Sequence, residues 1–137
     1  MDYLYLIIPL IVVIGSQAIK LATDGIRGNF DLRNFFITYG GMPSSHTALA
    51  VSVTTIVGLR QGFQSALFAV ALVFALLVMR DAMTIRRMLG KHGQALNQLL
   101  AGSPDAPHFP ERLGHSALEV FAGAVWGVAV TYFLNLL

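Results

Sequence analysis

The sequence contains no cysteine and carries few charged residues. Without cysteine, the chain can form neither a disulfide framework nor a thiolate metal site. Charged residues make up 12% of the chain, whereas a soluble domain normally carries about a quarter. This deficit, beside a hydrophobic content of 55%, argues against both a soluble globular protein and a disordered chain. The net charge of +2 is too small to indicate a partner made of nucleic acid.

Instead, the sequence has long apolar runs without charge. A membrane-spanning helix needs about 20 apolar residues, with a lower limit near 17. Four segments approach this length, at residues 3–19, 47–59 (if the helix begins near Ser44), 65–79 and 120–137. No basic residue precedes the first segment, so it is interpreted as a span rather than a secretory signal. We therefore predict one domain over residues 1–137, an all-α integral membrane bundle with about four transmembrane helices.

Basic residues are concentrated on one side of the predicted spans. Only Arg60 lies between the second and third spans. The loops after the first and third spans hold the other eight cations: Lys20, Arg27, Arg33, Arg80, Arg86, Arg87, Lys91 and Arg112. By the positive-inside rule, this bias predicts a multi-pass protein of the cell (inner) membrane with both long loops cytoplasmic and both termini outside.

A turn-rich stretch, Gly40-Gly41-Met42-Pro43-Ser44-Ser45-His46, directly precedes the second apolar run. Ser44 or Ser45 can cap the following helix, and a helix start with free backbone N–H groups is suited to bind an anion. His46 lies where it could give a proton to that anion. The alternative is an ordinary capped membrane helix with a histidine at the interface.

His115 and Glu119 stand four residues apart at the head of the last apolar run. If both are helical they share one face, where the carboxylate could accept an imidazole N–H and raise the basicity of the other ring nitrogen. Glu119 borders an uncharged run, so leaving it unpaired there would be costly. The alternative is an ordinary His–Glu pair at the membrane surface.

Lys20 and Arg27 follow the first apolar run and are separated by six residues. By themselves they would be cations that extend to the interface and set the orientation of the span. Gly123 and Gly127 form a small-x3-small step in the last run, which favours close packing of helices within or between chains. We therefore also predict a homodimer.

Together these pieces resemble the three-part signature of the type 2 phosphatidic acid phosphatases and vanadium haloperoxidases. That signature is Lys-x6-Arg-Pro, then Pro-Ser-Gly-His, then Ser-Arg-x5-His-x3-Asp. The matching stretches here are Lys20-x6-Arg27, Pro43-Ser44-Ser45-His46 and His115-x3-Glu119. Residues 40–46, 81–91 and 114–120 resemble, more closely, the small divergent branch of that superfamily. The arginine of the third part would fall on Phe109, so its nearest substitutes are Arg86, Arg87 and Arg112.

The resemblance implies a lipid phosphatase that uses neither a metal nor another cofactor. In the family, the last histidine attacks phosphorus and forms a phosphohistidine, an acidic residue orients it, and the second-part histidine protonates the leaving oxygen. Carried over, these roles fall to His115, Glu119 and His46. The phosphate would be held by Lys20, Arg27, Ser44, Ser45, Arg86 and Arg112. The substrate would be a membrane lipid bearing a phosphomonoester or a pyrophosphate.

Two other functions, neither of them that of a metal-independent phosphatase, remain alternatives. In the first, the protein binds or translocates anionic phospholipid headgroups without turnover. In the second, the acidic residues Asp24, Asp31, Asp81 and Glu119 hold Mg²⁺ around a phosphate, although their spacing matches no acidic metal motif.

Overall fold

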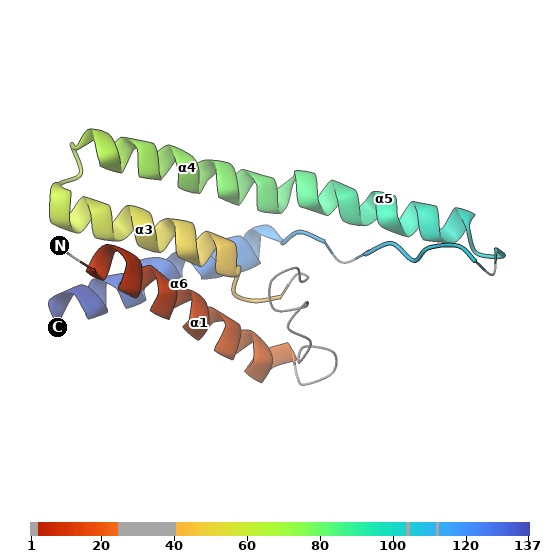
Figure 1. The fold of residues 1–137 in the computed structure, drawn as a ribbon, viewed down its shortest axis with the longest axis horizontal. Coiled ribbons are helices and arrows are strands. Elements are labelled where there is room, and N and C mark those ends of the chain that lie inside the picture. The colour runs from red at the N-terminus through yellow and green to blue at the C-terminus, as the bar shows by residue number, and fades with distance from the viewer. Residues whose placement is uncertain (1–2, 25–40, 104, 112) are drawn as a thin grey trace.

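The structure, a computed structural model, describes residues 3–24, 41–103, 105–111 and 113–137 (Figure 1). The described residues form α-helices and no β-strand, which confirms the all-α prediction. The helices are α1 (Leu4–Asp24), α3 (Ser45–Gln61), α4 (Ala66–Met83), α5 (Ile85–Leu99) and α6 (Ala117–Leu136).

Three helical stretches are long and apolar enough to cross a membrane: Leu4–Thr23, Ala66–Leu99 and Ala117–Leu136. They confirm the first, third and fourth predicted spans. The second predicted span corresponds to α3, which begins at Ser45 and has 17 residues, the lower limit for a span. Helix α3 lies beside the three apolar helices, so the bundle is built from the four predicted segments (Figure 1).

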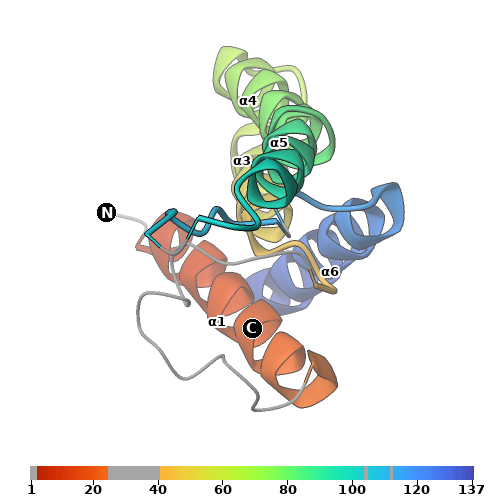
Figure 2. The same ribbon diagram turned by 90° about the vertical axis from the view of Figure 1, so that its right-hand side faces the viewer.

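Viewed along the helices, α3 lies at the centre, with α1, α4 and α6 around it (Figure 2). This position explains why α3 is less apolar than its neighbours. Two of its buried hydroxyl groups are satisfied within the protein: Ser52 Oγ and Thr131 Oγ1 are 2.6 Å apart, and the Thr54 hydroxyl donates to Ala50 O at 2.9 Å. A helix enclosed by other helices need not present an apolar surface to lipid.

Helix α6 packs closely on α3 through its two small residues. A Cβ atom on Gly123 would lie 2.5 Å from Ser44 O, and one on Gly127 would lie 2.7 Å from Ala48 O. The small-x3-small step is therefore used within the chain, between α6 and α3. On the other side of α6, Trp126 Nε1 donates to Val12 O of α1 at 3.0 Å.

Helices α4 and α5 form a nearly continuous rod, and α5 extends beyond the ends of the other helices (Figure 1). Arg86 and Arg87 lie in the first turn of α5, so helical structure continues beyond the charged end of the third apolar run. The chain then returns alongside α5, where Asn97 exchanges two hydrogen bonds of 2.9 Å with the backbone of Phe109. Gly90 and Gly93 bring α5 close to this returning segment, since their Cβ atoms would lie 2.6 Å from Glu111 O and 2.3 Å from Pro110 O.

Candidate functional site

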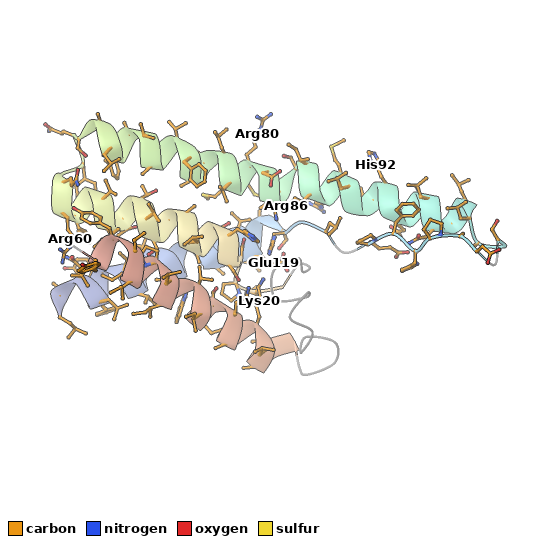
Figure 3. The ribbon with its side chains drawn as sticks, in the orientation of Figure 1. Lys20, Arg60, Arg80, Arg86, His92 and Glu119 are labelled. Atoms are coloured by element: carbon orange, nitrogen blue, oxygen red, sulfur yellow. The ribbon has the colours of Figure 1, made fainter. Side chains whose placement is uncertain are left out.

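The candidate site lies at one end of the bundle, where the last turns of α1 and α4 meet the first turns of α3, α5 and α6 (Figure 1). Lys20, Arg86 and Glu119 come from three different helices and lie near one another at this end (Figure 3). Arg60 lies at the opposite end, and Arg80 and His92 lie on the outer edge of the α4–α5 rod (Figure 3).

His115 occupies the turn that leads into α6. Its backbone N–H donates to Ala82 O at 2.9 Å, which ties this turn to the last turn of α4. The preceding residue, Gly114, has φ +83, and a Cβ there would lie 2.5 Å from Arg87 N. Only glycine fits both that backbone conformation and that space. The His115 side chain is buried, and neither ring nitrogen has a hydrogen-bond partner among the described residues.

Glu119 does not bind the imidazole of His115, so this part of the sequence prediction is wrong. One carboxylate oxygen accepts from Gly41 N at 3.2 Å, and the other accepts from Ser116 N at 2.7 Å. Ser116 Oγ in turn accepts from Glu119 N at 3.3 Å, which completes a capping box. The helix begins only at Ala117, so His115 lies before it and shares no helical face with Glu119.

Burial and positive charge set the protonation state of His115. They lower its pKa from 6.5 to about 4, first through burial and then through the charge of Lys20, with smaller contributions from His46 and Arg86. The nearby Glu119 carboxylate opposes this shift. The imidazole is therefore neutral at pH 7, with an unprotonated nitrogen available to attack or to accept a proton.

His46 is the second residue of α3, and its side chain is exposed. It lies within electrostatic range of His115, Lys20, Arg86 and Asp81. Residues that are distant in the sequence thus meet at one end of the bundle. A buried neutral imidazole and an exposed imidazole are placed among cations.

Arg86, one of the predicted substitutes for the missing arginine, lies in the first turn of α5 within electrostatic range of His115. Its Nε donates to Asp81 Oδ2 at 2.6 Å, and both side chains are partly exposed. The ion pair joins the last turn of α4 to the first turn of α5, so it fixes where the guanidinium group lies. Two other predicted phosphate ligands, Arg27 and Arg112, lie outside the described residues.

The serines of the second motif are buried at the start of α3. Ser44 precedes the helix; its N–H donates to Glu119 O at 3.0 Å, and its Oγ lies 2.9 Å from Thr47 Oγ1. Ser45 Oγ is buried, and no residue that the structure describes forms a hydrogen bond with it. Ser44 thus connects α3 to α6, whereas Ser45 keeps unused hydrogen-bonding capacity at the helix start.

Comparison with known proteins assigns this arrangement to a family. A family model described as "Divergent PAP2 family" matches residues 1–130. The chain belongs to the divergent PAP2 family. It is also 33% identical over 145 residues to a Bacillus subtilis (strain 168) protein named "Uncharacterized membrane protein YuiD", with 94% of this chain and 92% of that protein covered. No solved structure matches the chain.

In this member of the divergent PAP2 family, sequence motifs do not identify several of the groups that form the site. The Ala82 carbonyl and the Gly41 N–H are backbone groups, which no residue pattern reveals. The role of Glu119 as a capping residue did have a signal, since Ser116-x-x-Glu119 is the capping-box pattern. The pairing of Asp81 with Arg86 has no such pattern, because it depends on how α5 follows α4.

Two of the four acidic residues considered as Mg²⁺ ligands are engaged elsewhere, and a third lies outside the described residues. Asp81 pairs with Arg86 and Glu119 accepts two backbone N–H groups, while Asp31 is not described. Across the described part of this divergent PAP2 chain, no three histidine or acidic residues are grouped as metal ligands would be.

Proposed function

We propose that the protein is a membrane-embedded lipid phosphatase that acts without a metal ion on a lipid phosphomonoester or pyrophosphate. One observation carries the proposal: within the described part of the chain, the two nitrogens of the buried His115 imidazole have no hydrogen-bond partner, and they lie within electrostatic range of Lys20, Arg86 and His46. A buried polar group without a partner costs free energy, so such a group in a cationic site suggests that a ligand completes it.

In the proposed reaction, a nitrogen of His115 attacks phosphorus and the bond from phosphorus to the lipid oxygen breaks. The negative charge of the bound phosphate favours the protonated form of His46, which donates its proton to that oxygen, and the lipid alcohol leaves. A water molecule then attacks the phosphohistidine, giving its proton to the now neutral His46, and phosphate is released with His115 restored. The neutral state of His115 at pH 7 suits the first step, because a protonated imidazole has no electron pair to attack with.

The cations supply the electrostatic part of this reaction. In phosphoryl transfer, most of the catalysis comes from positioning and from stabilising charge on the phosphoryl oxygens. Lys20 is buried and acts electrostatically on His115, and Arg86 is held in place by Asp81. Ser45 Oγ and the first N–H groups of α3 add donors for the same oxygens. In this proposal, Arg27 and Arg112 are further ligands of the phosphate.

The test is phosphate release from phosphatidate and from a polyprenyl pyrophosphate by the purified protein in detergent with a chelator present. We expect His115→Ala and His46→Ala to abolish release and His92→Ala to leave it unchanged, because His92 lies on the outer edge of the rod (Figure 3). An acid-labile phosphoenzyme formed by the natural chain but not by the His115 variant would support the intermediate. Unchanged release by both site variants would reject the assignment.

One observation favours the second candidate, a protein that binds or translocates anionic headgroups without turnover. Glu119 bonds to backbone N–H groups rather than to His115, so the imidazole lacks the carboxylate that orients a catalytic histidine. Binding of phosphatidate vesicles that depends on Lys20 and Arg86, with no phosphate release, would select this candidate.

We also propose that the site faces the cytoplasm. The start of α1 and the end of α6 lie together at the end opposite the site (Figure 1), and the predicted orientation puts that end outside. Since the natural chain has no cysteine, single-cysteine variants at Ser103 and Gln61 can be labelled with an impermeant maleimide on intact cells. Labelling of Gln61→Cys alone fits the proposal, and labelling of Ser103→Cys alone contradicts it.

A homodimer stays a prediction, and its interface would have to lie outside the Gly123–Gly127 surface of α6. Gly123 and Gly127 contact Ser44 and Ala48 of the same chain, so they are not available to a second copy. Analytical ultracentrifugation in detergent, with the detergent density-matched, would determine the oligomeric state.

A further inference from the structure

An apolar groove of about 480 Å³ lies between α3, α4 and α6, within the part of the bundle that the apolar helices form. Its lining includes Val51 of α3, Met79 of α4 and Val128 of α6. The proposed reaction does not use it.

The groove is apolar even though two threonines line it. The Thr54 hydroxyl bonds to the carbonyls of Ala50 and Ala71 at 2.9 and 3.0 Å, and the Thr55 hydroxyl donates to Val51 O at 2.8 Å. Because these hydroxyls are satisfied within the protein, they offer little to a polar ligand. A hydrocarbon ligand fits this lining.

One end of the groove is close to the candidate site. Met79 lies one helical turn before Ala82, whose carbonyl accepts the His115 N–H. Val51 lies five residues after His46 on α3, about 7.5 Å along the helix axis. A lipid whose phosphate occupies the site can therefore extend a chain directly into the groove.

The other end is formed by an aromatic pair. Phe63 and Phe68 contact edge to face, with ring centroids 5.2 Å apart, and Phe63 packs so closely on Gly58 that a Cβ there would lie 2.6 Å from its ring. From Met79 to Phe68 the groove follows eleven residues of α4, about 16 Å. One leaflet of the hydrocarbon core is about 15 Å deep, so this length suits one chain of a lipid in that leaflet.

The length and the apolar lining of the groove suit one hydrocarbon chain. We propose that the groove binds a single hydrocarbon chain of the phosphate-bearing lipid, and that Phe63 and Phe68 limit the chain length it accepts. The identity of the headgroup rests on the proposed function; the binding of the chain does not require turnover.

The test compares two neighbouring positions on α4. Leu72 lines the groove and is 40% exposed, whereas Val73 is 57% exposed and does not line it. The probe is hexadecyl phosphate with a diazirine in mid-chain, and labelled peptides are identified by mass spectrometry. We expect labelling of α4 and α6 groove residues, lowered at least fivefold by Leu72→Trp and unchanged by Val73→Trp.

The same variants are assayed for phosphate release from hexadecyl phosphate and from butyl phosphate, which is too short to fill the groove. Leu72→Trp should lower release from the long substrate at least fivefold and leave release from butyl phosphate unchanged. Phe63→Ala should extend the range of accepted chain lengths. Groove labelling without any phosphate release would reject the proposed function and support the groove.

Three results would overturn the groove proposal. The first is equal labelling of Val73 and the groove residues, which would indicate ordinary contact with bulk lipid. The second is equal labelling by the corresponding alcohol, which lacks the phosphate. The third is a change of oligomeric state in Leu72→Trp without groove labelling of the natural chain, which would identify a second copy as the occupant.

Discussion

The backbone N–H of His115 donates a hydrogen bond to the carbonyl of Ala82, 2.9 Å away, and so ties the turn before α6 to the last turn of α4. The buried imidazole takes its position from this backbone contact and from Gly114 beside it. The backbone of the turn, rather than a side-chain partner, fixes where the imidazole lies.

The first prediction concerns Gly114. Gly114→Ala adds a Cβ that would lie 2.5 Å from Arg87 N at a residue with φ +83, so we expect a loss of about 2 kcal/mol in the free energy of unfolding. We also expect phosphate release to fall at least tenfold, because the His115 turn must shift. Thermal unfolding in detergent measures the first effect. Gly102→Ala is the control, since nothing lies within 4 Å of its added Cβ, and equal effects of the two substitutions would contradict the prediction.

The second prediction follows from the lowered pKa of His115. Between pH 6.5 and about 4, the unfolded chain takes up a proton on this histidine and the folded protein does not. The melting temperature should therefore fall as the pH decreases through this window, and His115 should contribute no further loss below about pH 4. Replacing His115 with Gln should make the fall shallower, and an identical pH profile for the variant would contradict the burial of a neutral imidazole.

The third prediction concerns the ion pair of Asp81 and Arg86. Asp81→Asn removes the charge that holds the guanidinium group, and we expect the KM for a lipid phosphate to rise on the order of tenfold with a smaller change in kcat. Arg86→Met should raise KM by as much or more. Asp105→Asn, at an exposed residue of the loop after α5, is the matched control. A fall in kcat alone would indicate that Asp81 does not act by positioning Arg86.

The fourth prediction concerns the packing of α6 on α3. Gly123→Leu should unfold the bundle or abolish phosphate release, because the side chain would meet Ser44 O of the same chain. Val125→Leu, at a half-exposed position of α6, should have no effect on either. If the glycines instead joined two chains, Gly123→Leu would give a stable, active monomer, which size-exclusion chromatography would detect.

The fifth prediction concerns the buried hydroxyl pair of Ser52 and Thr131, 2.6 Å apart. Ser52→Ala leaves the Thr131 hydroxyl without a partner and should lower the free energy of unfolding by about 1 kcal/mol. Adding Thr131→Val should restore part of this loss, giving a coupling free energy of about 0.5–1.5 kcal/mol in a double-mutant cycle. Additive effects would show that the hydrogen bond contributes nothing to stability.

The sequence was sufficient to predict the bundle because its physical cause is local. Uncharged runs of spanning length form helices in a membrane whatever their neighbours, and α1, α4 and α6 follow those runs. Helix α3 was harder to predict as a span, because its 17 residues only just reach the length that a membrane-spanning helix needs. Its polar residues fit in the bundle because other helices enclose them.

The sequence indicated that Lys20, His46 and Arg86 lie near His115, but it did not indicate their bonds. Spacing alone suggested that Glu119 would contact His115, but the Ser116 and Gly41 N–H groups take the carboxylate. Which arginine substitutes for the missing one depends on how α5 follows α4, and the pairing of Arg86 with Asp81 depends on that tertiary geometry. Backbone contacts such as His115 to Ala82 have no side-chain signature at all.

The rod formed by α4 and α5 has a mechanical consequence for the reacting groups. Helix α5 extends about 22 Å from Thr84, while His115 is attached at the joint itself, against Ala82 and Arg87. If the outer arm bends by about 5° at this joint, its tip moves by about 2 Å, and groups at the pivot move by only a few tenths of an ångström. A bending motion of α5 at this joint therefore displaces the imidazole much less than it displaces the tip of the helix.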